Sequence, residues 1–475
     1  MQKKISKYLI PIVLVIIAFS LSECRKKEQI LTDKSAKLEF SADSILFDTV
    51  FTTIGSTTKR FKIYNRNSQK MVISDIRLAR GANSNFRINV DGYPGPEINS
   101  VEIQANDSLF VFVQVTVDPN NINTPLVIYD QILFNTNGND QLVILEAWGQ
   151  DAYFHKNEVI CGSVTWPSDK PHVLYGIVAV GYPDICENSS LTIQPGTIVH
   201  GHVGSTLITY RSTLNAVGVV GNPVTFRGDR LEDYLLHHAD SVSGQWRGIY
   251  FFEARESRIE NATVRNAVIG IQVDTLTSAN FVNINKVKIE NSLFAGLITQ
   301  GGNVKVENCL FGNSGQHSAV VSIGGNANFN HCTFGNYWSE GVRKTAALVI
   351  TDYYLDANEN PVHRPFTKAD FTNCIIFGNV ENEVTIDMFD GSSVLSFKSC
   401  FYKQNDDNHT PEFFDTNCIR NQDPLFIDPF STWNFRLKTE SPAKNKADLS
   451  FPTQFNDDIE SKPRDAQPDL GCYEI

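Results

Sequence analysis

The sequence predicts an all-β protein in which an N-terminal β-sandwich is followed by a parallel β-helix. Two observations carry this prediction. Between residues 38 and 150, short apolar segments that alternate with polar residues recur with turn residues between them. Between residues 259 and 400, one phrase returns six times: an apolar residue, any residue, an Asn-like residue, and a small residue or cysteine. Repeats in fixed phase at variable intervals predict a solenoid whose strands stack while its loops differ.

The N-terminus has the composition of an export signal. Lysines among the first seven residues precede an apolar run from Tyr8 to Phe19, which is shorter than the ~20 residues that a membrane-spanning helix needs. Leu21-Ser-Glu-Cys24 follows and resembles the lipobox of bacterial lipoproteins, although Glu23 departs from the small residue usual there. The resemblance implies a signal peptide over residues 1–24, a lipid on Cys24 that anchors the chain to the bacterial outer membrane on its periplasmic or surface side, and a tether over residues 25–37. A plain cleaved signal peptide with an unmodified cysteine is the alternative.

Residues 38–150 are expected to fold as an immunoglobulin-like β-sandwich. About eight strand-like stretches occur there, separated by turn signals such as Asp91-Gly92 and Asn137-Gly138. Alternate positions from Leu109 to Val117 are apolar, as in a strand with one buried face. The segment resembles sandwich modules of bacterial envelope proteins, which act as spacers or docking domains and carry no catalytic residue.

Residues 191–422 are expected to form the β-helix, with residues 151–190 as a linker or N-terminal cap. The intervals between copies of the repeat vary too widely for helical repeats of fixed length, and each copy is rich in β-branched and aromatic residues. The stretches Leu191–Ile198 and Gln245–Phe251 resemble the entry coils of right-handed parallel β-helix proteins of the pectin-lyase type. That resemblance implies a right-handed solenoid, and insertions between its strands are where recognition is expected.

The Asn-like positions of the repeat predict a ladder of side chains along one corner of the solenoid. Equivalent residues of stacked coils lie about 4.8 Å apart, so side-chain amides can pass hydrogen bonds from coil to coil. We interpret the histidine of the column as structural rather than catalytic. The predicted members are Asn261, Asn291, Asn308, His331, Asn373 and Ser399.

The cysteines fall into two groups. Four share one phase of the repeat, where parallel side chains about 4.8 Å apart exceed the Cβ separation of about 3.5–4.5 Å that a disulfide prefers. These four are expected to be buried thiols: Cys309, Cys332, Cys374 and Cys400. Cys161 and Cys186 lie outside the repeat around a loop-like stretch and form the candidate disulfide.

The sequence pattern changes again over the last residues, 423–475. Asp423-Pro-Leu-Phe426, Ser441-Pro-Ala443 and Pro468–Glu474 follow one another, and together they resemble the choice-of-anchor type Q segment of bacterial surface β-helix proteins. Cys472 stands where that family has a small residue. The resemblance implies a C-terminal cap, which we expect over the last coil because an uncovered coil exposes unpaired backbone groups.

No motif indicates catalysis or a bound cofactor. The formal net charge is −12 and basic residues form no long run, which argues against nucleic acid as a partner. The adjacent acidic pairs of the chain would point to opposite faces of a strand. Asp356-Ala-Asn358-Glu-Asn360 begins like a calcium loop, but Pro361 replaces the glycine of the sharp turn. We therefore predict no catalytic residue, no metal site and no cofactor, with calcium as the weaker alternative.

Candidate binding residues lie in the insertion over residues 343–368 and shortly after it: Asp352, Tyr353, Tyr354, Asp387 and Asp390. The sequence favours a non-catalytic envelope or surface lipoprotein that displays a β-helix scaffold to bind a polysaccharide or another surface protein. Two alternatives stay open. One is a polysaccharide lyase or glycoside hydrolase acting on an acidic glycan, and the other is a purely structural spacer.

Overall fold

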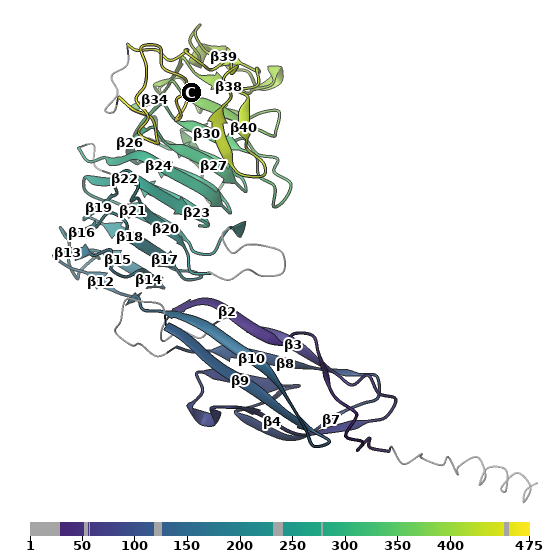
Figure 1. The fold of residues 1–475 in the computed structure, drawn as a ribbon. Helices are drawn as coiled ribbons and strands as arrows, with labels where there is room; N and C mark the ends of the chain where they lie inside the picture. The colour runs from purple at the N-terminus through teal and green to yellow at the C-terminus, as the bar shows by residue number, and fades with distance from the viewer. Residues whose placement is uncertain are drawn as a thin grey trace, which may run out of the picture. The chain divides into compact units, whose positions relative to one another are not determined.

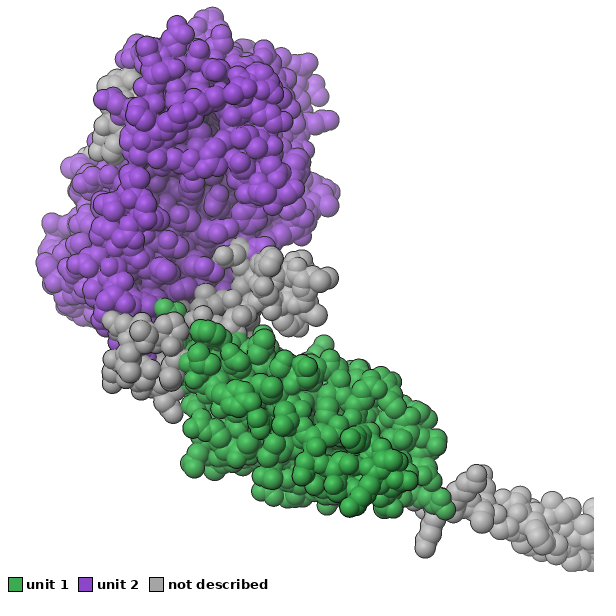
Figure 2. All heavy atoms as spheres, viewed as in Figure 1, with its two compact units in different colours: residues 1–120, 125–150 green, residues 121–124, 151–475 purple. Residues whose placement is uncertain are grey.

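The computed structural model describes residues 29–51, 56, 58–117, 126–230, 241–276, 279–450 and 456–475. The chain divides into two compact units: unit 1 is residues 1–120 with 125–150, and unit 2 is residues 121–124 with 151–475 (Figure 1; Figure 2). The described part is all-β, and its helical structure consists of 3-10 turns, at Gly81–Asn83, Asp406–Asn408, Pro411–Phe413 and at Ser241. Within it, no helix has the length and apolar character needed to cross a membrane. The predicted signal peptide and Cys24 lie outside the described residues.

Unit 1 consists of two five-stranded sheets that share one hydrophobic core. Alternating burial along strands such as Phe86–Val90 places one face of each sheet inward, and Phe61 meets Phe134 between the sheets with ring centroids 6.4 Å apart. The first sheet contains β1 (Glu39–Phe40), β3 (Lys59–Tyr64), β8 (Ser108–Val115), β5 (Phe86–Val90) and β6 (Tyr93–Gly95). The second contains β2 (Ser44–Phe51), β10 (Asn139–Gln150), β9 (Leu126–Thr136), β4 (Met71–Leu78) and β7 (Glu97–Ile103).

Unit 2 is a stack of coils whose strands pair in parallel with the strands of the next coil. The pairing follows three ladders, which we call sheets I, II and III; β22 and β24 run through sheets I and II and join them into one 18-stranded sheet. The chain visits each sheet once per coil, as in β17, β18 and β19, before β20 pairs with β17. This connectivity is that of a parallel β-helix.

The strands of each sheet are as follows. Sheet I contains β13 (Ser163–Trp166), β16 (Ser190–Ile193), β19 (Thr213–Val217), the first parts of β22 (Ser257–Arg265) and β24 (Val282–Ser292), β26 (Asn303–Glu307), β29 (Asn326–Asn330), β34 (Lys368–Thr372) and β37 (Leu395–Lys398). Sheet II contains β11 (Tyr153–Lys156), β14 (His172–Tyr175), β17 (Ile198–Gly201), β20 (Val224–Gly228), the second parts of β22 and β24, β27 (Leu310–Ser314), β30 (Thr333–Asn336), β35 (Ile375–Gly378), β38 (Phe401–Tyr402) and β39 (Ile419–Arg420). Sheet III contains β12 (Val159–Ile160), β15 (Ile177–Val180), β18 (Thr206–Tyr210), β21 (Gly248–Phe252), β23 (Ile269–Asp274), β25 (Ala295–Gln300), β28 (His317–Ser322), β31 (Leu348–Thr351) and β36 (Val384–Asp387).

The solenoid begins earlier than the sequence indicated. We expected a linker or cap over residues 151–190, but Tyr153–Lys156 already pairs in parallel with His172–Tyr175. These first coils lack the Asn-like phrase, so the repeat gave no signal there. The structure joins Cys161 to Cys186 in a disulfide with a Cα separation of 5.8 Å.

The predicted ladder needs one correction. Strand register aligns Glu260 with Asn285 and Ala262 with Val287, so Lys286, and not Asn291, occupies the coil next to Asn261. Asn291 lies five residues further on, at another corner, because β24 runs through two sheets. The observed column is Asn261, Lys286, Asn308, His331, Asn373 and Ser399, and each member has a positive φ between 46° and 55°. Left-handed backbone at a tight corner explains why asparagine recurs there.

The column binds the C-terminal segment as well as its own members. Asn373 Nδ2 lies 3.2 Å from His331 Nε2, but Asn308 Oδ1 accepts a hydrogen bond of 2.8 Å from Arg464. Lys286 forms an ion pair of 2.6 Å with Asp457. The amide ladder is therefore interrupted, and its polar atoms are satisfied partly by residues that follow the solenoid in sequence.

The C-terminal segment covers the side of the solenoid, where we expected it to cover the end. Its hairpin of β40 (Phe426–Asp428) and β41 (Asn434–Leu437) packs Phe435 into a cluster with Leu310 of sheet II. Residues before this segment cover the last coil instead: Phe414 stacks on Phe397 with ring centroids 4.4 Å apart. In Figure 1 the yellow C-terminal strand β40 lies beside the green coils of β27 and β30.

The core of the solenoid is filled by columns of like residues. Phe371 stacks between Phe329 and Phe397 with ring centroids 4.7 Å apart on each side. Beside them lie the repeat cysteines, which are buried free thiols: Cys309, Cys332, Cys374 and Cys400. Burial raises the pKa of the Cys332, Cys374 and Cys400 thiols, so these thiols act as small apolar fillers.

Candidate functional site

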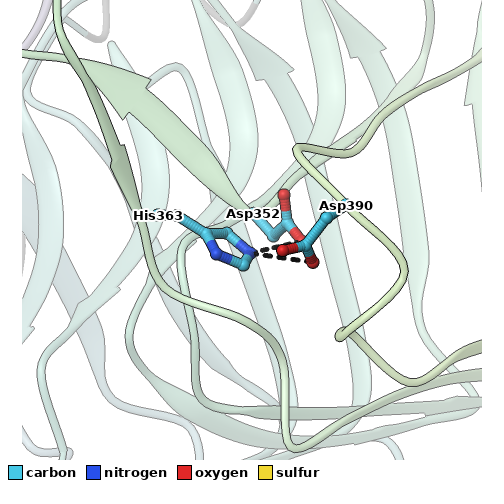
Figure 3. Close-up of side chains that lie close together, drawn as sticks. All are labelled: Asp352, His363 and Asp390. Atoms are coloured by element: carbon cyan, nitrogen blue, oxygen red, sulfur yellow. Dashed lines mark hydrogen bonds and ion pairs between the residues drawn. The ribbon is translucent and has the colours of Figure 1, made fainter.

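Two chain segments leave the same edge of sheet III side by side. Strand β31 ends at Thr351, and β36, its parallel neighbour, ends at the paired residue Asp387. The first segment continues into a hairpin of β32 (Tyr353–Leu355) and β33 (Pro361–His363), and the second continues through residues 388–393. Because the carboxyl ends of parallel strands meet at one edge, polar residues of both segments come together there (Figure 3).

Asp352 is the buried centre of this group. Its side chain is fully inaccessible to solvent. Oδ1 accepts a 2.7 Å hydrogen bond from the backbone N–H of Phe389, and Oδ2 accepts one of 2.7 Å from the hydroxyl of Ser393. Oδ2 also lies 3.1 Å from His363 Nε2. A buried carboxylate is stable only when it is hydrogen-bonded and paired, and these contacts fix its orientation.

Several oxygens converge on one nitrogen of His363. Besides Asp352 Oδ2, its Nε2 faces Asp390 Oδ1 at 3.7 Å and Ser392 Oγ at 3.5 Å. Figure 3 shows the imidazole directed at both carboxylates. Hydrogen bonding from Ser392 holds the pKa of the Asp390 carboxyl below its usual value. The histidine ring packs on Phe389, with centroids 4.8 Å apart.

An aromatic surface borders these polar groups. Phe389 is 49% exposed, and its ring centroid lies 5.9 Å from that of the partly exposed Tyr353. The hydroxyl of Tyr353 donates a 2.8 Å hydrogen bond to Asp387, which raises the pKa of the Tyr353 phenol. Exposed rings next to fixed acceptors form a surface that can bind a ligand with both apolar faces and hydroxyl groups.

The structure therefore brings four of the five predicted binding residues into one place: Asp352, Tyr353, Asp387 and Asp390. Tyr354 follows in the same hairpin but alternates to the other side of its strand. Sequence reasoning did not select His363, Phe389 or Ser393, which contact Asp352 or its partners. His363 lay in the insertion already singled out, and its pairing with Tyr353 across a hairpin is the signal that could have identified it.

The weak calcium signal is explained by the hairpin turn. Asp356 Oδ1 accepts backbone hydrogen bonds of 2.8 Å from Asn358 and 2.9 Å from Asn360. These bonds lower the pKa of the Asp356 carboxyl. The carboxylate thus shapes the turn, as aspartate does in many turns.

The histidine, serine and aspartate do not form a catalytic triad. In a triad, the aspartate binds one imidazole nitrogen and the nucleophile binds the other. Here Asp352 and Ser392 both face Nε2 of His363. Asp352 therefore cannot orient this imidazole to accept a proton from Ser392.

Comparisons with known proteins do not identify a family. No family model matches the chain, and no curated protein matches it. Among solved structures, a family 123 glycoside hydrolase from Clostridium perfringens is 8% identical over 27% of this chain and 30% of its own, with a TM-score of 0.19. The Escherichia coli chaperone DraB is 8% identical over 25% of this chain and 55% of its own, with a TM-score of 0.17. The CooA pilin subunit from enterotoxigenic Escherichia coli is 8% identical over 24% and 97%, with a TM-score of 0.18. Similarities this low carry no argument about fold or activity.

Proposed function

We propose that this chain is a bacterial envelope lipoprotein whose β-helix binds a polysaccharide, without cleaving it, at the Asp352–Asp390 site. In this proposal Cys24 carries the lipid anchor, unit 1 is an immunoglobulin-like spacer, and unit 2 is a right-handed β-helix of the pectin-lyase type. A right-handed course agrees with the strong preference for right-handed crossovers between parallel strands. The observation that carries the binding proposal is the exposed ring of Phe389 next to the Tyr353 ring, with Asp387 and Asp390 beside them.

The composition of the site favours sugars of neutral or positive charge. Faces of sugar rings are apolar and pack on exposed aromatic rings, while their hydroxyl groups donate hydrogen bonds to carboxylates. Asp387, Asp390 and the net charge of −12 repel an acidic glycan. The alternative of a lyase or hydrolase that acts on acidic glycans is therefore the less favoured one, and a surface protein is the other candidate ligand.

The test is a glycan array followed by titration calorimetry with the best ligand. We expect Phe389→Ala and Tyr353→Ala each to weaken binding by about 1–2 kcal/mol, or roughly 5- to 30-fold, because each removes a stacking surface. Tyr93→Ala is the matched control, since Tyr93 is 67% exposed but belongs to unit 1, and it should bind like the unaltered chain.

The same preparation distinguishes the alternatives. Absence of binding across neutral, basic and acidic glycans, or equal losses in Tyr93→Ala and Phe389→Ala, would refute the proposed site. Release of reducing ends or unsaturated products from any polysaccharide would make the protein an enzyme. Crosslinking that recovers a protein partner through Tyr353 would favour protein recognition instead.

A further inference from the structure

The convergence of Asp352, His363 and Asp390 is suited to a metal ion. All three ligand atoms lie within 4.8 Å of one another. Three oxygens, counting Ser392 Oγ, face a nitrogen that carries at most one proton. A single N–H can satisfy one of these acceptors at a time, whereas a cation at their centre attracts all of them. We propose that Asp352, His363 and Asp390 bind a divalent transition-metal ion, with zinc as the best fit.

The distances agree with a tetrahedral site. Zinc binds nitrogen and oxygen at about 2.0–2.1 Å, so a tetrahedral angle of ~109° places two ligand atoms about 3.3 Å apart. Nε2 of His363 lies 3.1 Å from Asp352 Oδ2 and 3.7 Å from Asp390 Oδ1. These two separations bracket the tetrahedral value, and the two carboxylate oxygens lie within 4.8 Å of each other, so side-chain shifts would complete the geometry. Asp390 is half-exposed and can make such a shift.

The ligands are held in advance by neighbouring groups. Asp352 accepts hydrogen bonds from the Phe389 backbone and the Ser393 hydroxyl, and Asp390 accepts a 2.8 Å hydrogen bond from the backbone of Ser392. Metal-binding carboxylates typically have such outer partners, which orient them and whose loss weakens metal binding about 10- to 100-fold.

Charge and ligand type select the class of ion. Both carboxylates face the same imidazole, His363, and a divalent ion would neutralise them more completely than one histidine can. Calcium takes oxygen ligands, and an imidazole nitrogen with two carboxylates suits zinc or manganese better. Three protein ligands leave a fourth position for water, for Ser392 or for a ligand, which is the arrangement of an open site.

Metal binding can be measured without any glycan, so its outcome is independent of the proposed polysaccharide binding. The full chain, stripped of metal by a chelator, is titrated calorimetrically with zinc, manganese and calcium chloride. We expect tight binding of one zinc ion at this site, weaker manganese binding and no calcium binding. The visible absorption of added cobalt(II) should have the high intensity of four-coordinate rather than six-coordinate cobalt.

Variants assign the site. His363→Ala and Asp390→Asn should each weaken zinc binding at this site by about 100-fold or more, and Ser393→Ala by about 10- to 100-fold. Asp356→Asn is the matched control, because Asp356 is a partly exposed carboxylate in the same hairpin, and it should bind zinc normally. Circular dichroism melting in the absence of metal shows that each variant is folded. Zinc binding that is unchanged in both His363→Ala and Asp390→Asn, or no zinc binding by the folded chain, would overturn the proposal.

Discussion

Acidification is expected to destabilise the first coils of unit 2, where two histidines share a hydrogen bond. Nε2 of His172 lies 3.0 Å from the carbonyl oxygen of Pro167, which can only accept, so this nitrogen carries the proton. Nδ1 of neutral His172 then accepts a hydrogen bond of 2.9 Å from Nε2 of His155. A second proton on His172 would place two N–H groups face to face, in a stack where Trp166 lies 4.6 Å from the His172 ring.

Burial, with a further contribution from His155, lowers the pKa of His172 from 6.5 to about 4. The folded state therefore binds fewer protons than the unfolded state, so stability is fully present above the unfolded pKa and is lost as pH falls from about 6.5 towards 4. With these two pKa values, the free energy of unfolding of unit 2 is about 2 kcal/mol lower at pH 5.0 than at pH 7.5 through this group alone. Burial also lowers the pKa of His155, although Glu158, 2.6 Å from its Nδ1, opposes that effect.

The assay is urea unfolding of the full chain from pH 7.5 to pH 5.0, followed by circular dichroism and tryptophan fluorescence. His172→Phe keeps an aromatic ring in the stack but cannot titrate, so its stability should fall about 2 kcal/mol less over this range than that of the unaltered chain. His409→Phe is the control, because His409 also stacks on an aromatic ring, Tyr402, but lies outside these coils. Equal pH dependence in the unaltered chain and in His172→Phe would refute the reasoning.

Three further predictions concern stability. Asn308→Ala should lower the free energy of unfolding by about 2–4 kcal/mol, since it removes the acceptor for Arg464 and leaves a β-carbon at a φ of 51°. Asn308→Gly should lower it by about 1 kcal/mol less, because glycine has no β-carbon, and equal stability of the two variants in urea unfolding would contradict this prediction. Arg343→Leu should cost about 3–5 kcal/mol because it leaves Glu383 buried without its ion pair, and the double variant with Glu383→Leu should recover part of the loss in thermal melting. Cys161→Ser opens a disulfide with a sequence separation of 25, which the chain-entropy model values at about 3.5 kcal/mol; mass spectrometry of the unreduced chain checks the bond, and an unchanged urea midpoint for the variant would contradict the estimate.

The repeat could be recognised in the sequence because the structural requirements that produce it are local. A tight corner between two strands needs left-handed backbone, which asparagine tolerates, and the adjacent inward position needs a small residue. The repeat copy around Asn308 and Cys309 meets both requirements. Register between coils is not local, however, and the phrase ending in Asn291 looked equivalent although it stands at another corner. In the column itself Lys286 takes the place of asparagine, and it is stabilised by its ion pair with Asp457, which is far away in the sequence.

Sequence reasoning could identify only part of the candidate site. Its acidic and aromatic residues stand in or just after a long insertion, which is where a solenoid presents recognition loops. That Asp352 is buried, and that Ser393 and Phe389 hold it, depends on two insertions that leave neighbouring strands of sheet III. The distance in sequence between the two segments is filled by strands of the other sheets, so no local spacing could reveal the contact.

The sequence by itself determined the all-β class, the existence of stacked coils and the positions of their corners, because alternation, turn chemistry and backbone handedness act within a few residues. The tertiary structure alone decided where the solenoid begins, which corner residues share a column, and that the described residues of the C-terminal segment, 423–450 and 456–475, pack along the side of sheet II. It also decided that Asp352, His363 and Asp390 converge. These outcomes depend on coil length and on packing between segments far apart in the chain. The free energy of such contacts depends on both partners, so the sequence of one segment alone does not predict it.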